Sequence, residues 1–589
     1  MNSQVSAVEK NFATMTSGES DRRLIRLAGW RIYAFTLTVY LLATQVTDAF
    51  FMGDANDYVE SILVHRRGYD LHFWEFGHLL WRPVGWVMAG MLQPVTSRIV
   101  GDYSRANVML TLVWLSLAAG LMGALCLVYL LRRYCRNGVV IALTTIGFIF
   151  SQGILNFAQT GSSYIPGLGF LMLGLCFITA PSETKKQFWM NGFAGGASLA
   201  VAVGFWFLFI WALPAAILMP VILNGATRER MKFAVASALS FSMCVGAFYS
   251  VALAILHITT LAGLKAWILD AGHGINIRGM LRMILGIARS FINMGNDGML
   301  MKRFLIGDAY NPVTVWQLAR LSLWKLALFY VFLASVLWLL WKAERKYRFL
   351  LLMAAALPVL GFAYFFGPGD IERYLALYPF LFLLVAYAVE HSTASVWVKA
   401  IPCIFLMAVV VTNGLAMFRP NLAYQQEKIA ARLGDLPLKM PRGSELVAVN
   451  WQDDLVNFYR SFPFHPLNQR ESYVVAALVT PGVEDAKVWR EDFAKRALRI
   501  WASNGELWLS NRAFSQRPAA DWNWVEGDDK NVSWKEFPDF FVNIKVGESS
   551  GGSDGFSLVP PTEENKQFLQ KQVGYGKQNL SQNLSQNPK

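Results

Sequence analysis

Long apolar runs separated by short polar loops fill the chain as far as Met417. A run of about twenty apolar residues can cross a bilayer as a helix, so the pattern predicts about eleven transmembrane spans. We expect them at residues 33–51, 108–131, 138–157, 164–180, 191–223 (as two helices), 233–257, 321–341, 349–366, 374–390 and 397–417. Residues 29–417 are therefore predicted to form an all-α polytopic membrane domain.

The run at 191–223 is divided because basic loops flank both of its ends. One helix cannot begin and end on the same side of a membrane, so we expect two short helices with a break near Gly204 or Pro214.

Lys and Arg residues cluster beside alternate spans, for example at 21–26, 132–136 and 342–348. Cytoplasmic loops carry this excess of positive charge, so residues 1–28 are predicted to be a cytoplasmic tail. The loops 52–106 and 258–318 and the C-terminus then lie outside. In the second of these loops apolar and basic residues interleave, as in amphipathic helices that lie among lipid headgroups. We expect a bacterial cytoplasmic (inner) membrane as the location.

After Met417 no membrane-length run remains and the pattern changes. Residues 445–450, 473–479 and 506–510 are predicted strands, and residues 453–461 and 488–503 predicted helices. This alternation is typical of a small α/β domain, which we place outside the membrane at 418–547. From residue 548 to 589 Gly, Ser, Gln and Asn dominate, which favours a disordered tail.

Composition agrees with a membrane protein: 54% of residues are hydrophobic, 16% are charged and the mean hydropathy is +0.35. The net charge of +13 could suggest a nucleic-acid partner. Because many Lys and Arg residues stand beside spans, we expect membrane lipids as partners and no nucleic acid. The five cysteines form no pattern typical of a disulfide framework or a zinc site.

The outer loop that follows the first span carries two candidate acids, Asp54 and Asp57. A carboxylate in a partly desolvated cleft at the end of a membrane helix can remove a proton from an acceptor hydroxyl. Asp54 can equally cap the helix that follows, since Gly-Asp-Ala-Asn-Asp-Tyr is a good helix-start signal. The two roles can coexist.

Later in the same loop stands Gly-His-Leu-Leu-Trp-Arg-Pro, preceded by Glu75. On a helix His78 and Arg82 would share a face, and an arginine fork binds phosphate well. The alternative is an interfacial helix whose arginine meets ordinary headgroups and whose Trp81 and Trp86 belong to the aromatic belt.

A third candidate is Gly-Pro-Gly-Asp-Ile-Glu-Arg-Tyr at 367–374, directly before an apolar run. Glu372 and Arg373 would lie at the mouth of a span on the same side as Asp54, where they could also be a structural ion pair. The loop 258–318 adds positive charge to that side through Arg278, Arg282, Lys302 and Arg303.

The stronger motifs of soluble enzymes are missing: we find no Gly-rich phosphate loop, zinc-type spacing or nucleophile elbow. The sequence predicts no definite cofactor. The carboxylates of the outer face could hold a divalent metal ion.

Taken together, these features resemble a family. An acid just after the first span, a His-x-Leu-x-x-Pro stretch, about eleven spans, an Arg-Tyr at the start of a late span and an outer C-terminal domain are similar to the GT-C superfamily. These integral-membrane glycosyltransferases use polyprenyl-phosphate sugars and include the protein mannosyltransferases and the aminoarabinose transferases of lipid A. The resemblance covers roughly residues 28–420 as architecture.

The resemblance implies an inverting transfer of a hexosyl or pentosyl group from a polyprenyl-phosphate donor to an extracytoplasmic glycan, lipid or protein, with Asp54 as general base. Asp54 is followed by Ala55 where the mannosyltransferases have an adjacent Glu, which weakens the case for a protein acceptor. We expect Asp54 and Asp57 at the catalytic centre, His78, Arg82 and Arg373 at the donor phosphate, and Glu75, Glu372 and Tyr374 in support.

Two other classes compete with this reading. A transporter or lipid flippase would place ionisable residues near the bilayer midplane and would show an internal repeat, whereas the charges here cluster at span ends and the halves do not match. A non-catalytic envelope scaffold would use the C-terminal domain as its binding module, although one anchor needs far fewer spans.

Overall fold

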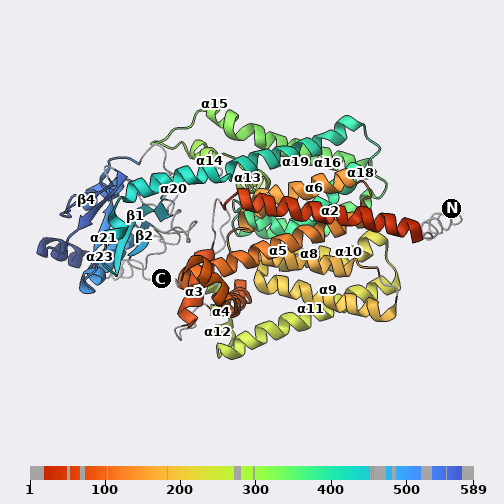
Figure 1. Ribbon diagram of the computed structural model, residues 1–589, viewed down its shortest axis with the longest axis horizontal. Coiled ribbons are helices and arrows are strands. Elements are labelled where there is room, and N and C mark those ends of the chain that lie inside the picture. The colour runs from red at the N-terminus through yellow and green to blue at the C-terminus, as the bar shows by residue number, and fades with distance from the viewer. Residues whose placement is uncertain are drawn as a thin grey trace, which may run out of the picture.

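A helical bundle and a small sheet domain make up the computed structural model of the chain (Figure 1). The structure describes residues 19–49, 54–66, 73–101, 104–181, 184–270, 280–295, 299–450, 453, 455–456, 473–479, 486–518, 533–551 and 554–573. The bundle and the sheet domain lie end to end, and the described chain begins at the end of the bundle away from the sheet (Figure 1).

The bundle contains the predicted spans. They are α2 (Glu19–Val46), α5 (Ser104–Tyr134), α6 (Gly138–Phe150), α8 (Tyr164–Ile178), α9 (Lys185–Phe205), α10 (Leu213–Asn224), α11 (Arg228–Ile255), α16 (Trp324–Trp341), α17 (Lys346–Phe365), α18 (Tyr378–His391) and α19 (Val396–Ala416). Within the described residues, 8 helices are long and apolar enough to cross a membrane, and α6 and α8 are shorter apolar helices. The predicted all-α membrane domain is thus confirmed.

The predicted break in the run at 191–223 is also confirmed. Helix α9 ends at Phe205, Trp206 is extended (φ −150°, ψ 113°), and the 3-10 helix η2 (Phe207–Ala212) leads into α10. At the break the Gly204 carbonyl accepts a hydrogen bond from the Leu80 backbone N–H at 2.8 Å. A side chain at Gly204 would collide with the Leu80 side chain, so glycine allows this close approach.

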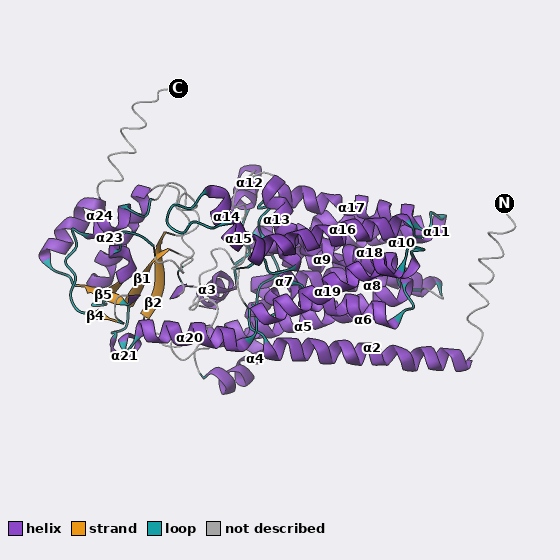
Figure 2. Cartoon of the chain, turned by 90° about the horizontal axis from the view of Figure 1, so that it is seen from above, coloured by secondary structure: helices purple, strands orange, loops and turns teal. Residues whose placement is uncertain are grey.

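Short helices cover the end of the bundle that faces the sheet domain (Figure 2). The loop after α2 forms α3 (Ala55–Arg66), the 3-10 helix η1 (Phe76–His78) and α4 (Trp81–Val100). The later loop forms α12 (Leu261–Asp270), α13 (Met280–Phe291), α14 (Met299–Ile306) and α15 (Val315–Leu318). The helices of the later loop match the helices predicted for residues 258–318.

The hairpin between α6 and α8 differs from the prediction of one continuous span over residues 138–157. Helix α6 ends at Phe150, and the chain turns at Ser151 (ψ 140°) into the short helix α7 (Gln152–Phe157). The side chains of Thr160, Ser162 and Ser163 are fully buried. The outer loop covers them: for example, the Trp81 indole N–H donates to the Gly161 carbonyl at 3.2 Å.

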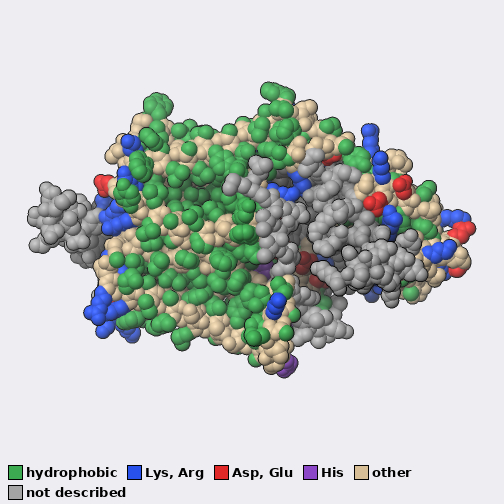
Figure 3. All heavy atoms as spheres, turned by 180° about the vertical axis from the view of Figure 1, so that it is seen from behind, with side chains coloured by type: hydrophobic (Ala, Val, Ile, Leu, Met, Phe, Trp, Pro, Cys, Tyr) green, Lys and Arg blue, Asp and Glu red, His purple; other side chains and the backbone are tan. Residues whose placement is uncertain are grey.

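Lys and Arg side chains gather at the end of the bundle away from the sheet domain, while apolar side chains cover its middle (Figure 3). We call this end the basic end; it includes Arg132 and Arg133 at the end of α5, Lys185 and Lys186 at the start of α9, and Arg228 at the start of α11. The distribution is the one expected at the cytoplasmic side of a membrane protein.

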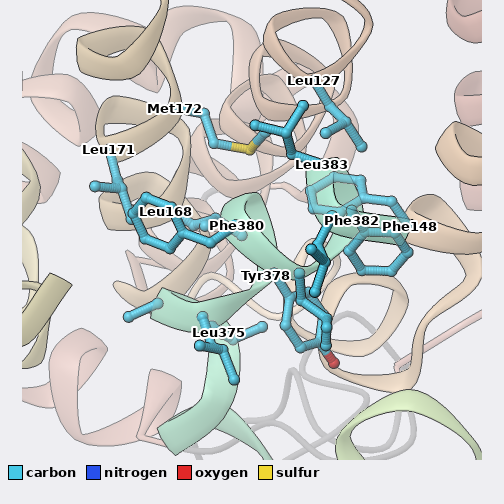
Figure 4. Packing of buried hydrophobic residues seen from close by; sticks show 14 of the residues in the cluster. Leu127, Phe148, Leu168, Leu171, Met172, Leu375, Tyr378, Phe380, Phe382 and Leu383 are labelled. Carbon is cyan, nitrogen blue, oxygen red and sulfur yellow. The ribbon is translucent and has the colours of Figure 1, made fainter. Parts of the chain in front are cut away.

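Helix α18 lies at the centre of the bundle. Its residues from Tyr378 to Val389 are all buried, because a helix that is apolar on every side is stable only when surrounded. Figure 4 shows its side chains among those of α5, α6 and α8. The labelled neighbours are Leu127, Phe148, Leu168, Leu171 and Met172. The 3-10 helix η5 (Ile371–Leu377) precedes α18 directly and is held in place by it.

The C-terminal domain is an α/β domain, as predicted. Its sheet has the order β2-β1-β3-β5-β4, with β1 (Ser444–Asn450), β2 (Tyr473–Val479) and β3 (Leu507–Ser510) parallel and β5 (Phe556–Val559) antiparallel to β3. One apolar cluster joins α20 (Arg419–Leu433) and α21 (Leu436–Lys439) to the sheet. A second joins α23 (Ala486–Ala502) and α24 (Glu536–Phe541) to it. The predicted helix at 453–461 lies almost wholly outside the described residues.

The prediction of a disordered tail from residue 548 is wrong for residues 549–573. Strands β4 (Ser549–Ser550) and β5 complete the sheet, and residues 563–573 are helical. Phe556 and Val559 are buried within strand β5, and Leu569 is buried in the second apolar cluster. These few apolar residues hold the segment, although polar residues dominate its composition.

A buried ion pair ties α20 to the sheet. Arg432 donates to both carboxylate oxygens of Asp453, at 2.6 and 3.2 Å, and Arg512 approaches the same carboxylate at 3.6 Å. Burial alone would raise the pKa of Asp453, but the charges of Arg432 and Arg512 bring that pKa below its ordinary value. Asp453 is therefore ionised at neutral pH and holds the two arginines.

Asn413 of α19 should be needed for stability. Its fully buried amide donates to the carbonyls of Phe150 and Phe291, each at 2.7 Å, and accepts from the Asn293 N–H at 2.7 Å. Asn413→Ala would leave three backbone groups without this partner, and each buried group left unsatisfied costs about 1–3 kcal/mol of stability. We expect a markedly lower Tm in detergent, while the exposed Val411→Ala in the same helix should be nearly neutral. Equal Tm values for the two variants would contradict this role.

Candidate active site

Asp54 lies directly before α3, and its carboxylate faces the bundle. Asp54 Oδ2 accepts a hydrogen bond from the Tyr164 hydroxyl at 2.5 Å and a longer one from the Tyr58 hydroxyl at 3.4 Å. Tyr58 is one turn further along α3, and Tyr164 is the first residue of α8. In the described hydrogen bonds of this carboxylate, both donors are tyrosine hydroxyls. The side chain therefore bonds to residues at the end of the bundle rather than to the backbone amides of α3.

Tyr58 keeps its proton. Burial raises its pKa well above the ordinary value, and the neighbouring charges of Asp54 and Glu75 raise it further. The hydroxyl therefore acts as a donor toward Asp54. Tyr58 also lies 3.3 Å from the Ser163 hydroxyl, which connects Asp54 to the next residue of the site.

His78 is buried and neutral at physiological pH, because burial lowers the pKa of its imidazole despite the charges of Glu75 and Asp54. Its Nδ1 lies 2.7 Å from Ser163 Oγ and 3.2 Å from the Phe205 carbonyl oxygen. A carbonyl can only accept, so both contacts are satisfied when Nδ1 carries the proton. Nε2 is then the acceptor nitrogen, and a hydrogen-bonded series runs from His78 through Ser163 and Tyr58 to Asp54.

Arg82 lies in the first turn of α4, where only 5% of its surface is exposed. Its guanidinium forms an ion pair with Glu75 and lies over the Tyr58 ring, 4.9 Å from the ring centre. In the part of the chain that the structure describes, Arg82 Nε is buried and meets no hydrogen-bond acceptor. Buried N–H groups are nearly always hydrogen-bonded, so this donor suits an anionic ligand.

Glu372 and Arg373 lie in η5, at the mouth of the α18 span. Arg373 Nε lies 3.7 Å from Glu372 Oε1 and 3.7 Å from Asp370 Oδ2, which is beyond hydrogen-bond distance. Its guanidinium lies 5.8 Å from the centre of the Trp206 ring, and Trp206 packs against Tyr164 at 4.6 Å. Arg373 Nε is also buried and without an acceptor among the described residues.

Tyr374 positions this region instead of facing Asp54. Its hydroxyl donates to the Pro368 carbonyl at 2.6 Å, and Arg289 of α13 donates to the Gly369 carbonyl at 2.8 Å. Gly286 packs so closely against the Pro368 carbonyl that a side chain there would overlap it. Helix α13 thus holds the loop 367–370 beside Arg373.

The structure brings together Asp54, Glu75, His78 and Arg82, and links them through Trp206 to Glu372 and Arg373. Asp57 is exposed on α3, and none of the described contacts joins it to this cluster. Of the basic residues in the later loop, Arg303 pairs with the buried Asp308, Arg282 is exposed, and Arg278 lies outside the described residues.

Sequence reasoning missed Tyr58, Ser163, Tyr164 and Trp206. Two signals could have found the first three: Tyr58 stands four residues after Asp54 on a helix, and Ser163 ends the polar stretch that directly precedes Tyr164 at the start of α8. Metal binding has no visible site in the described ranges, where no group of three or more His, Cys, Asp and Glu side chains could hold an ion.

Fold and site define a polytopic membrane protein with a buried cluster of acids, arginines and tyrosines at one end of its bundle. No protein family and no curated protein matches the chain. Among solved structures, the crystal structure of ArnT from Cupriavidus metallidurans bound to undecaprenyl phosphate is similar, with a TM-score of 0.48 and 12% sequence identity. The match covers 90% of this chain and 98% of that chain.

Gly286→Ala should disturb the loop beside Arg373. The added methyl group would overlap the Pro368 carbonyl, and overpacking of this kind typically costs about 1–3 kcal/mol. We expect a lower Tm for Gly286→Ala. Gly361→Ala in α17 is the matched control, because a side chain there meets nothing within 4 Å and alanine favours a helix. The role of Gly286 would be refuted by a Tm that does not fall below that of the control.

Proposed function

We propose that the chain is an inverting membrane glycosyltransferase that moves a sugar from a polyprenyl-phosphate donor to an extracytoplasmic acceptor. One observation carries the proposal: a carboxylate held by two tyrosines is connected through aromatic rings to two arginines whose buried Nε–H groups have no described acceptor. Such a site joins a base to an anion-binding surface, as transfer from a sugar phosphate requires.

The donor phosphate would bind between Arg82 and Arg373. The Arg82 guanidinium lies over the ring of Tyr58, whose hydroxyl donates to Asp54. The Arg373 guanidinium lies near the Trp206 ring, which packs against Tyr164, the second donor to Asp54. Arg82 already forms an ion pair with Glu75, and Arg373 lies 3.7 Å from both Glu372 and Asp370. A phosphate would supply the missing acceptors, and its growing negative charge would be stabilised as the lipid phosphate departs.

The acceptor hydroxyl would meet Asp54. Both tyrosines donate to Oδ2, so Oδ1, which has no partner among the described hydrogen bonds, would take the hydroxyl proton. The oxygen then attacks the anomeric carbon on the face opposite the phosphate, the bond from that carbon to the phosphate oxygen breaks, and the lipid phosphate keeps the electron pair. Attack from the opposite face inverts the anomeric centre.

The resemblance to the GT-C superfamily points to the same reaction, with the site on the extracytoplasmic side of a bacterial inner membrane. Accordingly we propose that His78 belongs to the site as a neutral hydrogen-bonding partner of Ser163, and that Tyr374 supports Arg373 through the loop 367–370. An exposed Asp57 fits a role on the helix surface better than one in catalysis.

Asp54→Asn should abolish transfer. Loss of a general base typically lowers the rate by about 10²–10⁴, and asparagine can still accept the tyrosine hydrogen bonds, so the fold should persist. The measurement is transfer of labelled sugar from a panel of polyprenyl-phosphate donors in membranes that contain equal amounts of each protein. Asp57→Asn changes an equally charged residue one turn away and should retain activity. Transfer that survives Asp54→Asn would refute the proposed base.

Arg82→Gln and Arg373→Gln should each slow transfer strongly. Removal of one hydrogen-bond donor to a developing anion typically costs about 10²–10³ in kcat. Arg98→Gln, on the exposed face of α4, is the matched control and should be active. Tm values in detergent show whether each variant is folded. If folded Arg82→Gln and Arg373→Gln proteins transfer sugar at the wild-type rate, the donor phosphate binds elsewhere.

A further inference from the structure

An apolar groove of about 700 Å³ opens on the bundle surface between α2, α5, α8 and α9. Helix α5 lines its length from Ala118 to Tyr129, and Tyr33, Cys176 and Gln187 line it from the other three helices. The groove lies in the half of the bundle nearer the basic end, away from Asp54. Neither the fold nor the proposed reaction explains it.

The groove has the length of one lipid leaflet. Ala118 lies at the middle of α5, and Tyr129 lies one turn before Arg133. Eleven residues of α-helix rise roughly 16 Å, and half of the hydrocarbon core of a bilayer is roughly 15 Å thick. An apolar groove that faces the bilayer over this depth fits an acyl chain from the leaflet at the basic end.

Two arginines stand at the headgroup end of the groove, on rings that line it. The Arg133 guanidinium lies 4.7 Å from the centre of the Tyr129 ring and donates to the Tyr129 hydroxyl at 2.7 Å. The Arg132 guanidinium lies 5.7 Å from the centre of the Tyr33 ring. Exposed Lys185 and Lys186 precede Gln187 at the start of α9. Positive charge thus stands where a lipid phosphate would meet water.

We propose that this groove is a binding site for one anionic phospholipid of the leaflet at the basic end. Its acyl chain would lie along α5 between Ala118 and Tyr129, and its phosphate would meet Arg132 and Arg133. The site is separate from the proposed donor site, and it does not depend on the proposed reaction.

Lipid titration of the purified full-length protein in detergent, read by native mass spectrometry, tests the site. The probes are phosphatidylglycerol, phosphatidylethanolamine and undecaprenyl phosphate. We expect one phosphatidylglycerol to bind at least about tenfold more tightly than phosphatidylethanolamine. The double variant Arg132→Gln with Arg133→Gln should bind phosphatidylglycerol roughly thirtyfold more weakly, since each basic residue near an anionic lipid contributes about fivefold. A double variant Arg228→Gln with Lys346→Gln, at the same end of the bundle, should bind normally.

Leu125→Trp fills the groove without changing any charge and should also remove the tight site. A second readout, cysteine labelling, uses a protein whose groove is unchanged. Cys126 and Cys176 line the groove, so phosphatidylglycerol should slow the reaction of these two thiols with an apolar maleimide. That protein carries alanine in place of Cys135, Cys244 and Cys403.

Equal binding of phosphatidylglycerol and phosphatidylethanolamine would overturn the proposal, as would tight binding that survives in a folded Leu125→Trp protein. Preference of the groove for undecaprenyl phosphate would overturn it as well, because the occupant would then be a prenyl lipid. If Leu125→Trp fails to fold, unprotected labelling of Cys126 and Cys176 in the presence of phosphatidylglycerol decides against the site.

Discussion

Complete burial of α18 is the constraint on which the rest of the structure depends. A helix that is apolar on every side must be enclosed, and α5, α6, α16 and α17 enclose it. Because η5 leads directly into α18, Glu372 and Arg373 are carried into the end of the bundle, where unpaired charges are costly. Their neighbours follow from this: Arg373 meets Asp370, Glu372 and the Trp206 ring, and Trp206 packs on the tyrosine that holds Asp54.

The bundle end also shows how polar groups are accommodated at membrane depth. The turn between α7 and α8 is buried together with Ser162 and Ser163, so its hydroxyls and carbonyls need partners within the protein. Trp81, Tyr58 and His78 of the outer loop supply several of them. The same contacts that satisfy the turn bring the outer loop against the bundle, and in doing so they place Asp54 beside Tyr164.

Much of this could be predicted from the sequence, and the failures have physical reasons. Spans depend on the length of apolar runs, so their order was predictable, as was the break near Gly204. The position of Asp54 just after the first span and of Arg373 at the mouth of the α18 span was predictable, because each stands directly beside an apolar run. Tyr58 and Tyr164 were not, because a tyrosine beside apolar residues has the same pattern whether it packs in a core or holds a carboxylate. The segment 549–573 was missed because a few buried residues, such as Phe556 and Leu569, outweigh a polar composition.

Helix α20 sets how far the sheet domain stands from the end of the bundle. It follows α19 after a short turn and is fixed to the sheet by the buried Arg432–Asp453 pair, so one continuous helix connects the bundle to the sheet domain. With 15 residues this helix is roughly 22 Å long. The sheet domain therefore stands beyond the end of the bundle, and a change in the length of α20 would change the spacing between the two parts of the protein.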